Sequence, residues 1–527
     1  MMRRSLLLLV VLIIACAPVL AQKRAFQLED LYRIKGVSDV HVSPDGSRIV
    51  YVLTVSDLAR ARRSNQIWMM DASGKSERQL SPEGTNASSP RFSPDGRQLA
   101  FITTKDGSSN IFLINTDGGE VRQLTNISTG VYDQLWSADG KWMAFSTDVY
   151  PECGADDACN KKIAERWEQG PLHAHMADDL FYRHWNAWKD GTRTHIFLVS
   201  VATGEVRDLT PGDFDSPTFQ LGGPLQYDFS PDGTEFVFVS NHDKNPESST
   251  NNDLWLLSLT DTNAKARNIT ASNPAYDGSP MYSPDGRFIA YRMQKQPAYE
   301  SDLFRLALYD RKSGTSTVLT ESFRNWVDEF EWMEDSKTIF FNSGVEGVNP
   351  IFRLDLASKE ITQIFTDNTI GDLNFSHDGH RLIYTTRSVG EVAEIYSADF
   401  VGPFTERNGN KPGSLWTTKQ LSHFNDAFMN EVDVRPAETM WVTASDGKRI
   451  HVFIVKPHNF DPNKKYPLIL NVHGGPQQMW GDAFRGDWQV YPGAGYVVAF
   501  CNPRGSTGYG QEFTAEISGD VGGKVFD

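Results

Sequence analysis

Residues 467–476 read Pro-Leu-Ile-Leu-Asn-Val-His-Gly-Gly-Pro, an apolar run that stops abruptly at two glycines. The run Leu468–Val472 predicts a strand that is buried on both faces, as in a parallel sheet. Gly474 and Gly475 then let the backbone turn sharply and bring bare N–H groups to a surface. On its own, this segment is also compatible with a plain turn at the end of a strand.

A second unit of the same kind follows. Tyr496–Cys501 is another apolar run, and residues 502–510 after it read Asn-Pro-Arg-Gly-Ser-Thr-Gly-Tyr-Gly. Two buried strands with glycine loops at their carboxyl ends are typical of the part of an α/β hydrolase that precedes the nucleophile.

The two motifs, in this order, resemble the prolyl oligopeptidase family of serine peptidases, and within it the branch of dipeptidyl-peptidase V and acylaminoacyl-peptidase. The resemblance implies an acyl-transfer site in which the Gly475 N–H donates to the oxyanion and Gly474 shapes the turn. It implies that His473 is structural or lines the pocket, and that Arg504 braces the loop or faces the pocket. Ser506 is rejected as the nucleophile, because its loop matches a structural loop of the family.

A repeat precedes these strands. Ser-Pro-Asp-Gly or a close variant occurs six times and a degenerate copy, Met-Glu-Asp-Ser, once; the seven copies begin at residues 43, 93, 137, 230, 283, 333 and 376. Proline, aspartate and glycine are turn residues, and an apolar run follows each copy, so each copy predicts a hairpin.

A second apolar hairpin alternates with the first, as at Gln66–Asp71 and Asn110–Asn115. Seven copies of both hairpins predict seven four-stranded blades, and a closed β-propeller over residues 22–430 protects the strand edges. The rivals are an open β-solenoid or a string of sandwiches. Residues 431–527 are expected to be the N-terminal part of an α/β-hydrolase domain.

The interval between residues 137 and 230 is too long for one plain blade and predicts an insertion at 148–193. This insertion has a helical stretch, Asn160–Gln169, and then an aromatic-rich stretch, Asp179–Trp188. It is either a lid packed on the propeller or a border of the peptide site. Under the family resemblance, Glu165 and Glu168 are candidate partners for a substrate α-amine.

The first 21 residues carry Arg3 and Arg4, then an apolar run and a small-residue ending at Ala21, which predicts a secretory signal rather than a membrane span. A lipid-modified Cys16 is the minority alternative. The protein is therefore expected to be periplasmic or secreted. Its formal charge of −16 and the absence of a basic block argue against nucleic-acid binding.

Three cysteines remain beyond the signal. Cys153 and Cys159 lie close together in a polar stretch and predict a disulfide in a secreted protein. A metal pair is the rival, but no histidine–cysteine set with zinc spacing surrounds them, so no metal and no organic cofactor is implied. Cys501 is expected to be a buried thiol.

In the family, a serine in G-x-S-x-G, an aspartate and a histidine follow the second glycine loop. The sequence contains no G-x-S-x-G, so the chain is expected to stop before its triad, with the catalytic residues beyond Asp527. The predicted activity of the full-length protein is a serine exopeptidase acting on short peptides, while the chain as given is expected to be inactive. The alternative is a noncatalytic propeller scaffold that resembles TolB.

Overall fold

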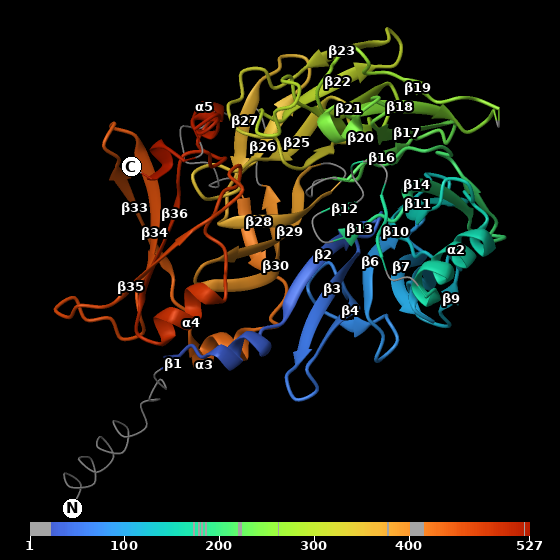
Figure 1. The fold of residues 1–527 in the computed structure, drawn as a ribbon. Helices are drawn as coiled ribbons and strands as arrows, with labels where there is room; N and C mark the ends of the chain where they lie inside the picture. The colour runs from blue at the N-terminus through green and yellow to red at the C-terminus, as the bar shows by residue number, and fades with distance from the viewer. Residues whose placement is uncertain are drawn as a thin grey trace, which may run out of the picture.

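The computed structural model describes residues 23–526 except 172–173, 178–179, 181–182, 185–186, 220–223, 262, 377–378, 401–415 and 521. The predicted signal and the alternative lipid site at Cys16 therefore lie outside the described residues. Figure 1 shows a ring of β-sheets with a smaller group of strands attached to one side.

Seven four-stranded antiparallel sheets form the ring, each from one continuous stretch of chain. Blades 1 and 2 are β2 (Gly36–Val42), β3 (Arg48–Asp57), β4 (Arg62–Asp71), β5 (Arg78–Gln79), and β6 (Ala87–Phe92), β7 (Gln98–Lys105), β8 (Ser108–Asn115), β9 (Arg122–Gln123). Blades 3 and 4 are β10 (Tyr132–Trp136), β11 (Trp142–Val149), β14 (Arg193–Ser200), β15 (Val206–Asp208), and β16 (Tyr227–Phe229), β17 (Glu235–Ser240), β18 (Asp253–Ser258), β19 (Arg267–Asn268).

Blades 5 and 6 are β20 (Asp277–Tyr282), β21 (Phe288–Met293), β22 (Arg305–Asp310), β23 (Thr315–Val318), and β24 (Phe330–Trp332), β25 (Thr338–Asn342), β26 (Ile351–Asp355), β27 (Ile361–Phe365). Blade 7 is β28 (Thr369–Phe375), β29 (Arg381–Ser388), β30 (Glu391–Phe400), β31 (Trp416–Gln420). The predicted seven-bladed propeller is confirmed.

The ring is closed by side chains rather than by a shared strand. Val37 and Ile49 of blade 1 share a buried cluster with Ile383 and Ile395 of blade 7. The Asn374 side chain also donates to the Val40 carbonyl at 2.8 Å across the same seam. Since each of the other blade pairs has an apolar cluster of its own, burial around the whole circle holds the ring.

The Ser-Pro-Asp-Gly turns are alike because their side chains make the same bonds. In the first copy, the Ser43 hydroxyl donates to Asp45 at 2.6 Å and accepts from the Arg48 N–H at 2.9 Å. Gly46 has a φ of 71°, which glycine adopts without strain. In the degenerate copy Ser336 takes the glycine's place, with a φ of 53°.

The smaller part is one mixed sheet in the order β33-β34-β36-β35, formed by β33 (Ala437–Thr443), β34 (Arg449–Val455), β35 (Leu468–Val472) and β36 (Val497–Asn502). Short helices α4 (Asp487–Gly493) and α5 (Gln511–Ala515) and the 3-10 turn η3 (Lys524–Phe526) accompany it. Trp488 of α4 stacks on Phe500 of β36 with ring centroids 3.5 Å apart, at the centre of its core.

The expectation that β35 is buried on both faces is wrong. Leu468, Leu470 and Val472 are 62%, 60% and 55% exposed. β35 is the edge strand of this sheet and pairs only with β36, and no described residue covers its outer face. Cys501 is likewise half-buried, not buried.

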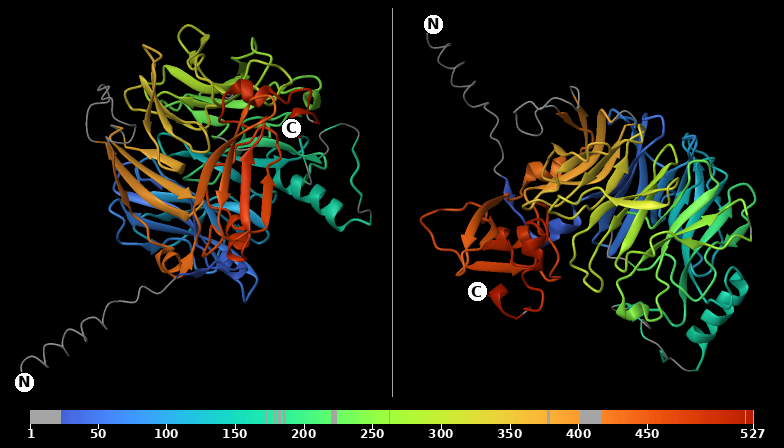
Figure 2. Two further views of the ribbon diagram at one scale, coloured as in Figure 1. Left: turned by 90° about the vertical axis from the view of Figure 1, so that its left-hand side faces the viewer. Right: turned by 90° about the horizontal axis from the view of Figure 1, so that it is seen from above.

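The N-terminal segment ties the two parts together. β1 (Arg24–Ala25) pairs in parallel with β32 (Val432–Asp433), which follows α3 (Asp426–Glu431) in the connection between the propeller and the smaller sheet. The 3-10 turn η1 (Leu28–Tyr32) follows β1. Phe26 is buried there against Phe428 and Val432. Figure 2 shows this junction beside the last blade.

The insertion in blade 3 contains α2 (Asp157–Gln169) and a short hairpin, β12 (Arg183–His184) with β13 (Ala187–Trp188); the 3-10 turn η2 (Pro246–Ser248) lies in blade 4. The helix agrees with the helical stretch expected from the sequence. α2 lies at the opposite end of the molecule from the smaller sheet (Figures 1 and 2).

Candidate active site

The two glycine loops leave the same edge of the smaller sheet. β35 and β36 are parallel, with Leu468 opposite Val497 and Val472 opposite Cys501, so the loops that follow them start side by side. The Thr507 N–H donates to the Gln478 carbonyl at 3.2 Å, which joins the second loop to the segment just after the first.

His473 is held inside this edge. Its Nε2 lies 2.9 Å from the Ser506 hydroxyl oxygen, and burial lowers the pKa of the imidazole. Ser506 is fully buried and donates its own proton to the Pro503 carbonyl at 2.5 Å, so its oxygen accepts from His473. This serine is therefore a structural bridge between the loops, and it offers no nucleophile to a substrate.

Gly474 and Gly475 are exposed, and Gly475 has a φ of 141°. Within the described part of the chain, the Gly475 N–H donates to no acceptor. An exposed N–H at the end of a strand can serve as one of the hydrogen-bond donors that an oxyanion requires.

Arg504 is buried and bound to other segments of the smaller domain. Its guanidinium is 3% exposed and bridges Glu516, just after α5, at 2.6 Å and Asp446, in the β33–β34 turn, at 2.5 Å. Its Nε donates to the Lys524 carbonyl at 3.3 Å. The side chain thus connects three separate segments of the smaller domain.

We expect Arg504→Met to destabilise this domain by about 2 kcal/mol, since charge-assisted hydrogen bonds to two carboxylates are lost. Arg504→Lys should recover only part of the loss, because lysine lacks the planar fork. Urea unfolding of residues 22–527 measures both. Arg60→Met removes an exposed arginine paired with Asp57 and should change little. Equal losses at positions 504 and 60 would contradict the bridging role.

Loops of blades 5 to 7 dock onto this edge. The β25–β26 turn inserts between the two glycine loops: the Glu346 N–H donates to the Gly508 carbonyl at 3.0 Å, and the Gly347 carbonyl accepts from the Asp482 N–H at 2.8 Å. From blade 7, the Val389 N–H donates to Asp482 at 2.7 Å. Trp326, between blades 5 and 6, donates to Gln511 at 3.2 Å.

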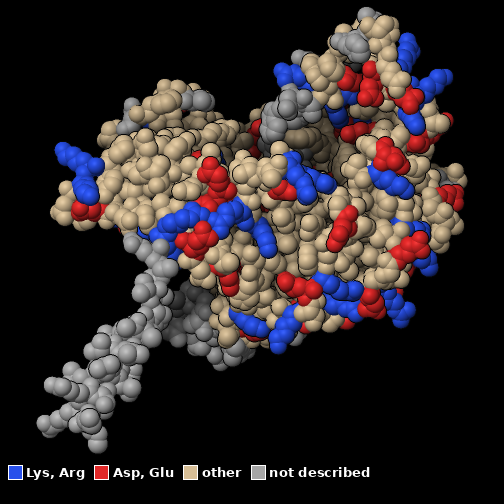
Figure 3. Space-filling view, turned by 90° about the horizontal axis from the view of Figure 1, so that it is seen from below, with Lys and Arg blue, Asp and Glu red and all other residues tan. Residues whose placement is uncertain are grey.

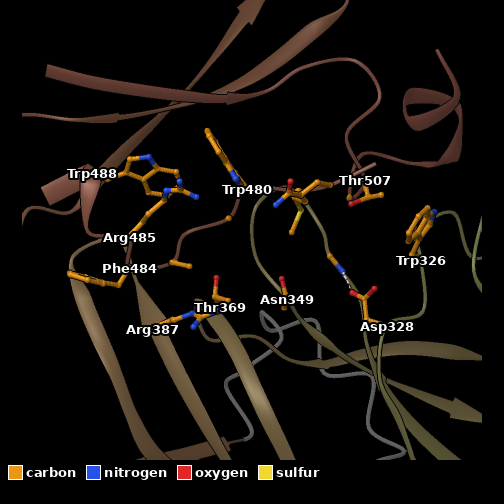
Figure 4. A pocket seen from close by; sticks show the side chains of 16 residues that line it. Trp326, Asp328, Asn349, Thr369, Arg387, Trp480, Phe484, Arg485, Trp488 and Thr507 are labelled. Carbon is orange, nitrogen blue, oxygen red and sulfur yellow. Dashed lines mark hydrogen bonds between the residues drawn. The ribbon is translucent and has the colours of Figure 1, made fainter. Parts of the chain in front are cut away.

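A cavity of about 460 Å³ lies between the two parts. The propeller contributes Trp326, Asp328, Gly344, Asn349, Thr369 and Arg387, and the smaller domain contributes residues 478–481, 483–485, 488 and 507–508. Figure 4 shows Trp326 and Asp328 at one end and Arg387 and Arg485 at the other. Its volume falls within the roughly 300–1,000 Å³ range of small-molecule sites.

Glu165 and Glu168 do not belong to this cavity. Both are exposed on α2, and the Glu165 carboxylate lies 4.0 Å from the Lys161 ammonium one turn away. The structure joins Cys153 to Cys159 by a disulfide just before and within α2. The assignment of Glu165 and Glu168 to a substrate amine stays a prediction.

Among the described residues, no three His, Cys, Asp or Glu side chains converge in a way that could hold a metal ion. No helix in the described ranges is long and apolar enough to cross a bilayer. On the face shown in Figure 3, basic and acidic side chains are interspersed.

The cavity-lining propeller residues Trp326, Asp328 and Arg387 were missed by reasoning from the sequence. Trp326 and Asp328 lie in the loop between β23 and β24, and Arg387 lies near the end of β29; the repeat carries no signal at these positions.

Comparison with known proteins gives relatives that are longer than this chain. Dipeptidyl-peptidase 5 of Porphyromonas gingivalis is 29% identical over 507 residues, which cover 93% of this chain and 69% of that protein. The uncharacterized peptidase YuxL of Bacillus subtilis is 29% identical over 520 residues, covering 96% and 75%. The acylaminoacyl peptidase of Pyrococcus horikoshii has a similar fold, with a TM-score of 0.72 at 18% identity, covering 95% of this chain and 70% of that one.

A seven-bladed propeller whose loops close over the glycine loops of an α/β sheet defines the class of propeller-capped α/β hydrolases. The sequence model of the TolB beta propeller domain matches residues 34–154, and that of the Prolyl oligopeptidase family matches residues 482–527. The end of the chain thus matches the Prolyl oligopeptidase family, and the chain is similar to peptidases over most of its length.

Proposed function

We propose that the protein is a serine exopeptidase that releases dipeptides or N-blocked amino acids from short peptides through an acyl-enzyme. One observation carries the proposal: Thr507 and Gly508 of the second glycine loop and residues 478–481, just after the first loop, line the interdomain cavity, and no described residue accepts a hydrogen bond from the exposed Gly475 N–H. In this role Gly475 donates to the oxyanion, Gly474 shapes the turn, and His473 and Arg504 hold the loops in place. The propeller loops restrict the site to short or unfolded peptides.

The catalytic serine, aspartate and histidine are assigned to sequence beyond Asp527, because no G-x-S-x-G occurs in the 527 residues. The apolar segment before Ala21 supports a periplasmic or secreted location, and the Cys153–Cys159 disulfide is in keeping with an oxidising compartment.

The experiment is to extend the reading frame past Asp527 and assay its full product. We expect a G-x-S-x-G within about a hundred residues, as the place of that motif in the fold requires. The full product should cleave dipeptidyl or acetyl-aminoacyl chromogenic substrates. If the motif is missing, or if the product leaves both substrate classes intact, the peptidase proposal is lost.

We expect residues 22–527 not to react with a serine-directed probe. In residues 22–527 the Ser506 hydroxyl is buried and hydrogen-bonded, so this serine is not available as a nucleophile. We therefore expect no labelling by a fluorophosphonate above that of heat-denatured protein. The full product of the extended reading frame is the positive control. Specific labelling of residues 22–527 would refute the assignment.

A second candidate is a noncatalytic scaffold, which the match of residues 34–154 to the TolB beta propeller domain favours. The same assay separates the two candidates. A scaffold would bind partners through the propeller and show no hydrolysis even with the downstream sequence present.

A further inference from the structure

Near the start of the third strand, several blades carry a buried polar side chain that holds the segment leaving the fourth strand. In blade 2 the Asn110 side chain accepts from the Ile127 N–H at 2.8 Å and donates to the Ile127 carbonyl at 3.3 Å. In blade 7 the Glu394 carboxylate accepts from the N–H groups of Phe424 and Asn425, at 3.2 and 2.9 Å. The side chain at this position therefore matches the backbone groups of the segment that it holds.

In blade 3 this position is His195, which is fully buried and has an acceptor at each ring nitrogen. Its Nδ1 lies 2.8 Å from a carboxylate oxygen of Asp208 on β15, and its Nε2 lies 2.9 Å from the Gly212 carbonyl oxygen. The other carboxylate oxygen of Asp208 accepts from the Thr210 N–H at 2.9 Å. A neutral imidazole carries one N–H and an imidazolium carries two. Only the imidazolium can donate to both acceptors.

The segment that His195 holds, residues 209–216, joins the end of the blade 3 insertion to blade 4. The Asp215 carboxylate pairs with the Lys189 ammonium at the end of the insertion. The Asp215 backbone carbonyl accepts from the Ser240 hydroxyl of blade 4 at 2.9 Å. A change at His195 is therefore passed to both the insertion and the neighbouring blade.

The charged groups around the imidazole favour its protonated form. Asp208 and Asp215 are the carboxylates whose charges act on it. The cations of this region are already paired with carboxylates: Lys189 with Asp215, and Arg193 with Asp213 at 2.9 Å. The positive charge of the imidazolium is thus balanced chiefly by Asp208, which is itself almost fully buried.

Burial and these partners act on the ring in opposite directions. β11, which pairs with β14 (Figure 1), faces His195 through the uncharged Thr147. Burial alone lowers the pKa of His195, but the hydrogen bond to Asp208, its charge and the Gly212 carbonyl raise it, and the net shift is upward. The electrostatics therefore agree with the geometry, which requires two N–H donors.

We propose that His195 is a pH-sensitive switch for residues 209–216 and for the end of the insertion that they hold. As the imidazolium it donates to both Asp208 and Gly212. When the ring gives up one proton to water, the remaining N–H stays with the Asp208 carboxylate, and the lone pair of Nε2 faces the Gly212 carbonyl. Because two acceptors then oppose each other in a buried place, the segment separates from the ring.

The direction of the pH dependence follows from the raised pKa. The folded protein binds this proton more tightly than the unfolded chain, whose histidine has the ordinary pKa of 6.5. The stability contributed by the two hydrogen bonds of His195 is therefore fully present below pH 6.5 and is lost as pH rises through the folded-state pKa. The inference is independent of peptidase activity.

The test is hydrogen–deuterium exchange of residues 22–527 at pH 6 and pH 9, corrected for the intrinsic effect of pH on exchange. We expect peptides within residues 209–216 to exchange at least tenfold faster at pH 9, since local opening exposes their N–H groups. Residues 125–131 of blade 2 are the internal control. They are held by Asn110, which does not titrate, and their corrected exchange should stay the same. This comparison uses the unaltered protein.

Variants then assign the effect to the ring. Asp208→Asn removes the charge that favours the imidazolium, so the acceleration should begin about one pH unit lower or more. His195→Gln cannot titrate, so exchange of residues 209–216 should no longer depend on pH. His423→Gln is the matched control, because His423 forms an exposed pair with Asp426 and should leave the profile unchanged. Urea unfolding at pH 6 checks that the variants are folded.

Four results would overturn the proposal. The first is equal exchange of residues 209–216 at both pH values, and the second is an equal acceleration of residues 125–131, which would indicate a general loosening. The third is an acceleration that persists in His195→Gln. The fourth is an Asp208→Asn variant whose exchange accelerates at the same pH as in the parent protein.

Discussion

Gly347→Ala should cost about 3 kcal/mol and loosen the hydrolase sheet from the propeller, because it adds a steric clash to backbone strain. Glu346 and Gly347 have φ angles of 48° and 88°, the signature of a type I′ turn. A Cβ on Gly347 would lie 2.5 Å from Cζ of Phe453. Phe453 has little freedom to move, since it stacks on Phe500 with centroids 4.7 Å apart.

The matched control is Gly107→Ala. Asp106 and Gly107 form the corresponding turn of blade 2, with φ angles of 53° and 94°, and a Cβ there would meet nothing within 4 Å. The loss of stability in Gly107→Ala measures the backbone strain alone, which we expect to be about 1 kcal/mol. Urea unfolding gives the stabilities, and limited proteolysis shows whether cleavage within residues 431–527 accelerates. If the two variants lose the same stability, the turn of blade 6 does not hold the domains together.

The propeller could be predicted because its signal is repeated. Each Ser-Pro-Asp-Gly copy makes its turn from its own side chains, as Ser43 and Asp45 do, so the pattern survives in the sequence whatever surrounds it. The degenerate copy at residues 333–336 still forms a hairpin because Ser336 accepts a left-handed backbone. Local chemistry repeated seven times specifies both the number of blades and the order of strands.

The burial of β35 could not be predicted, because it depends on which segments cover the sheet. The run Leu468–Val472 is apolar in either case, and only the tertiary structure shows that its outer face is open. For the same reason, the sequence could predict only part of the candidate site. The Gly474–Gly475 motif marks one wall, but Asp328 reaches the cavity through a loop between blades, and that approach exists only once the ring closes.

Glu331→Gln should stabilise the propeller at alkaline pH. Glu331 lies on β24, and the first strands of the blades form the innermost layer of the ring. Burial raises the pKa of Glu331 to about 8 from the ordinary 4.5, and from the described residues its carboxylate accepts one hydrogen bond, from the Phe375 N–H at 3.4 Å. No cation among the described residues pairs with it. The folded state therefore favours the protonated carboxyl.

The sign of the pH dependence follows from that raised pKa. Below about pH 4.5 the carboxyl is protonated in both states and costs nothing; between pH 4.5 and 8 unfolding releases a proton, so stability falls as pH rises. Since Glu331 is only partly buried, solvent screens the charge, and we expect Glu331→Gln to exceed the parent by about 2 kcal/mol at pH 9 and to match it near pH 4.5. Urea midpoints at pH 4.5, 7 and 9 measure the difference. Glu205→Gln removes an exposed carboxylate and should show no such trend. A gain at position 331 that is the same at all three pH values would mean that the glutamine acts through packing and not through the buried charge.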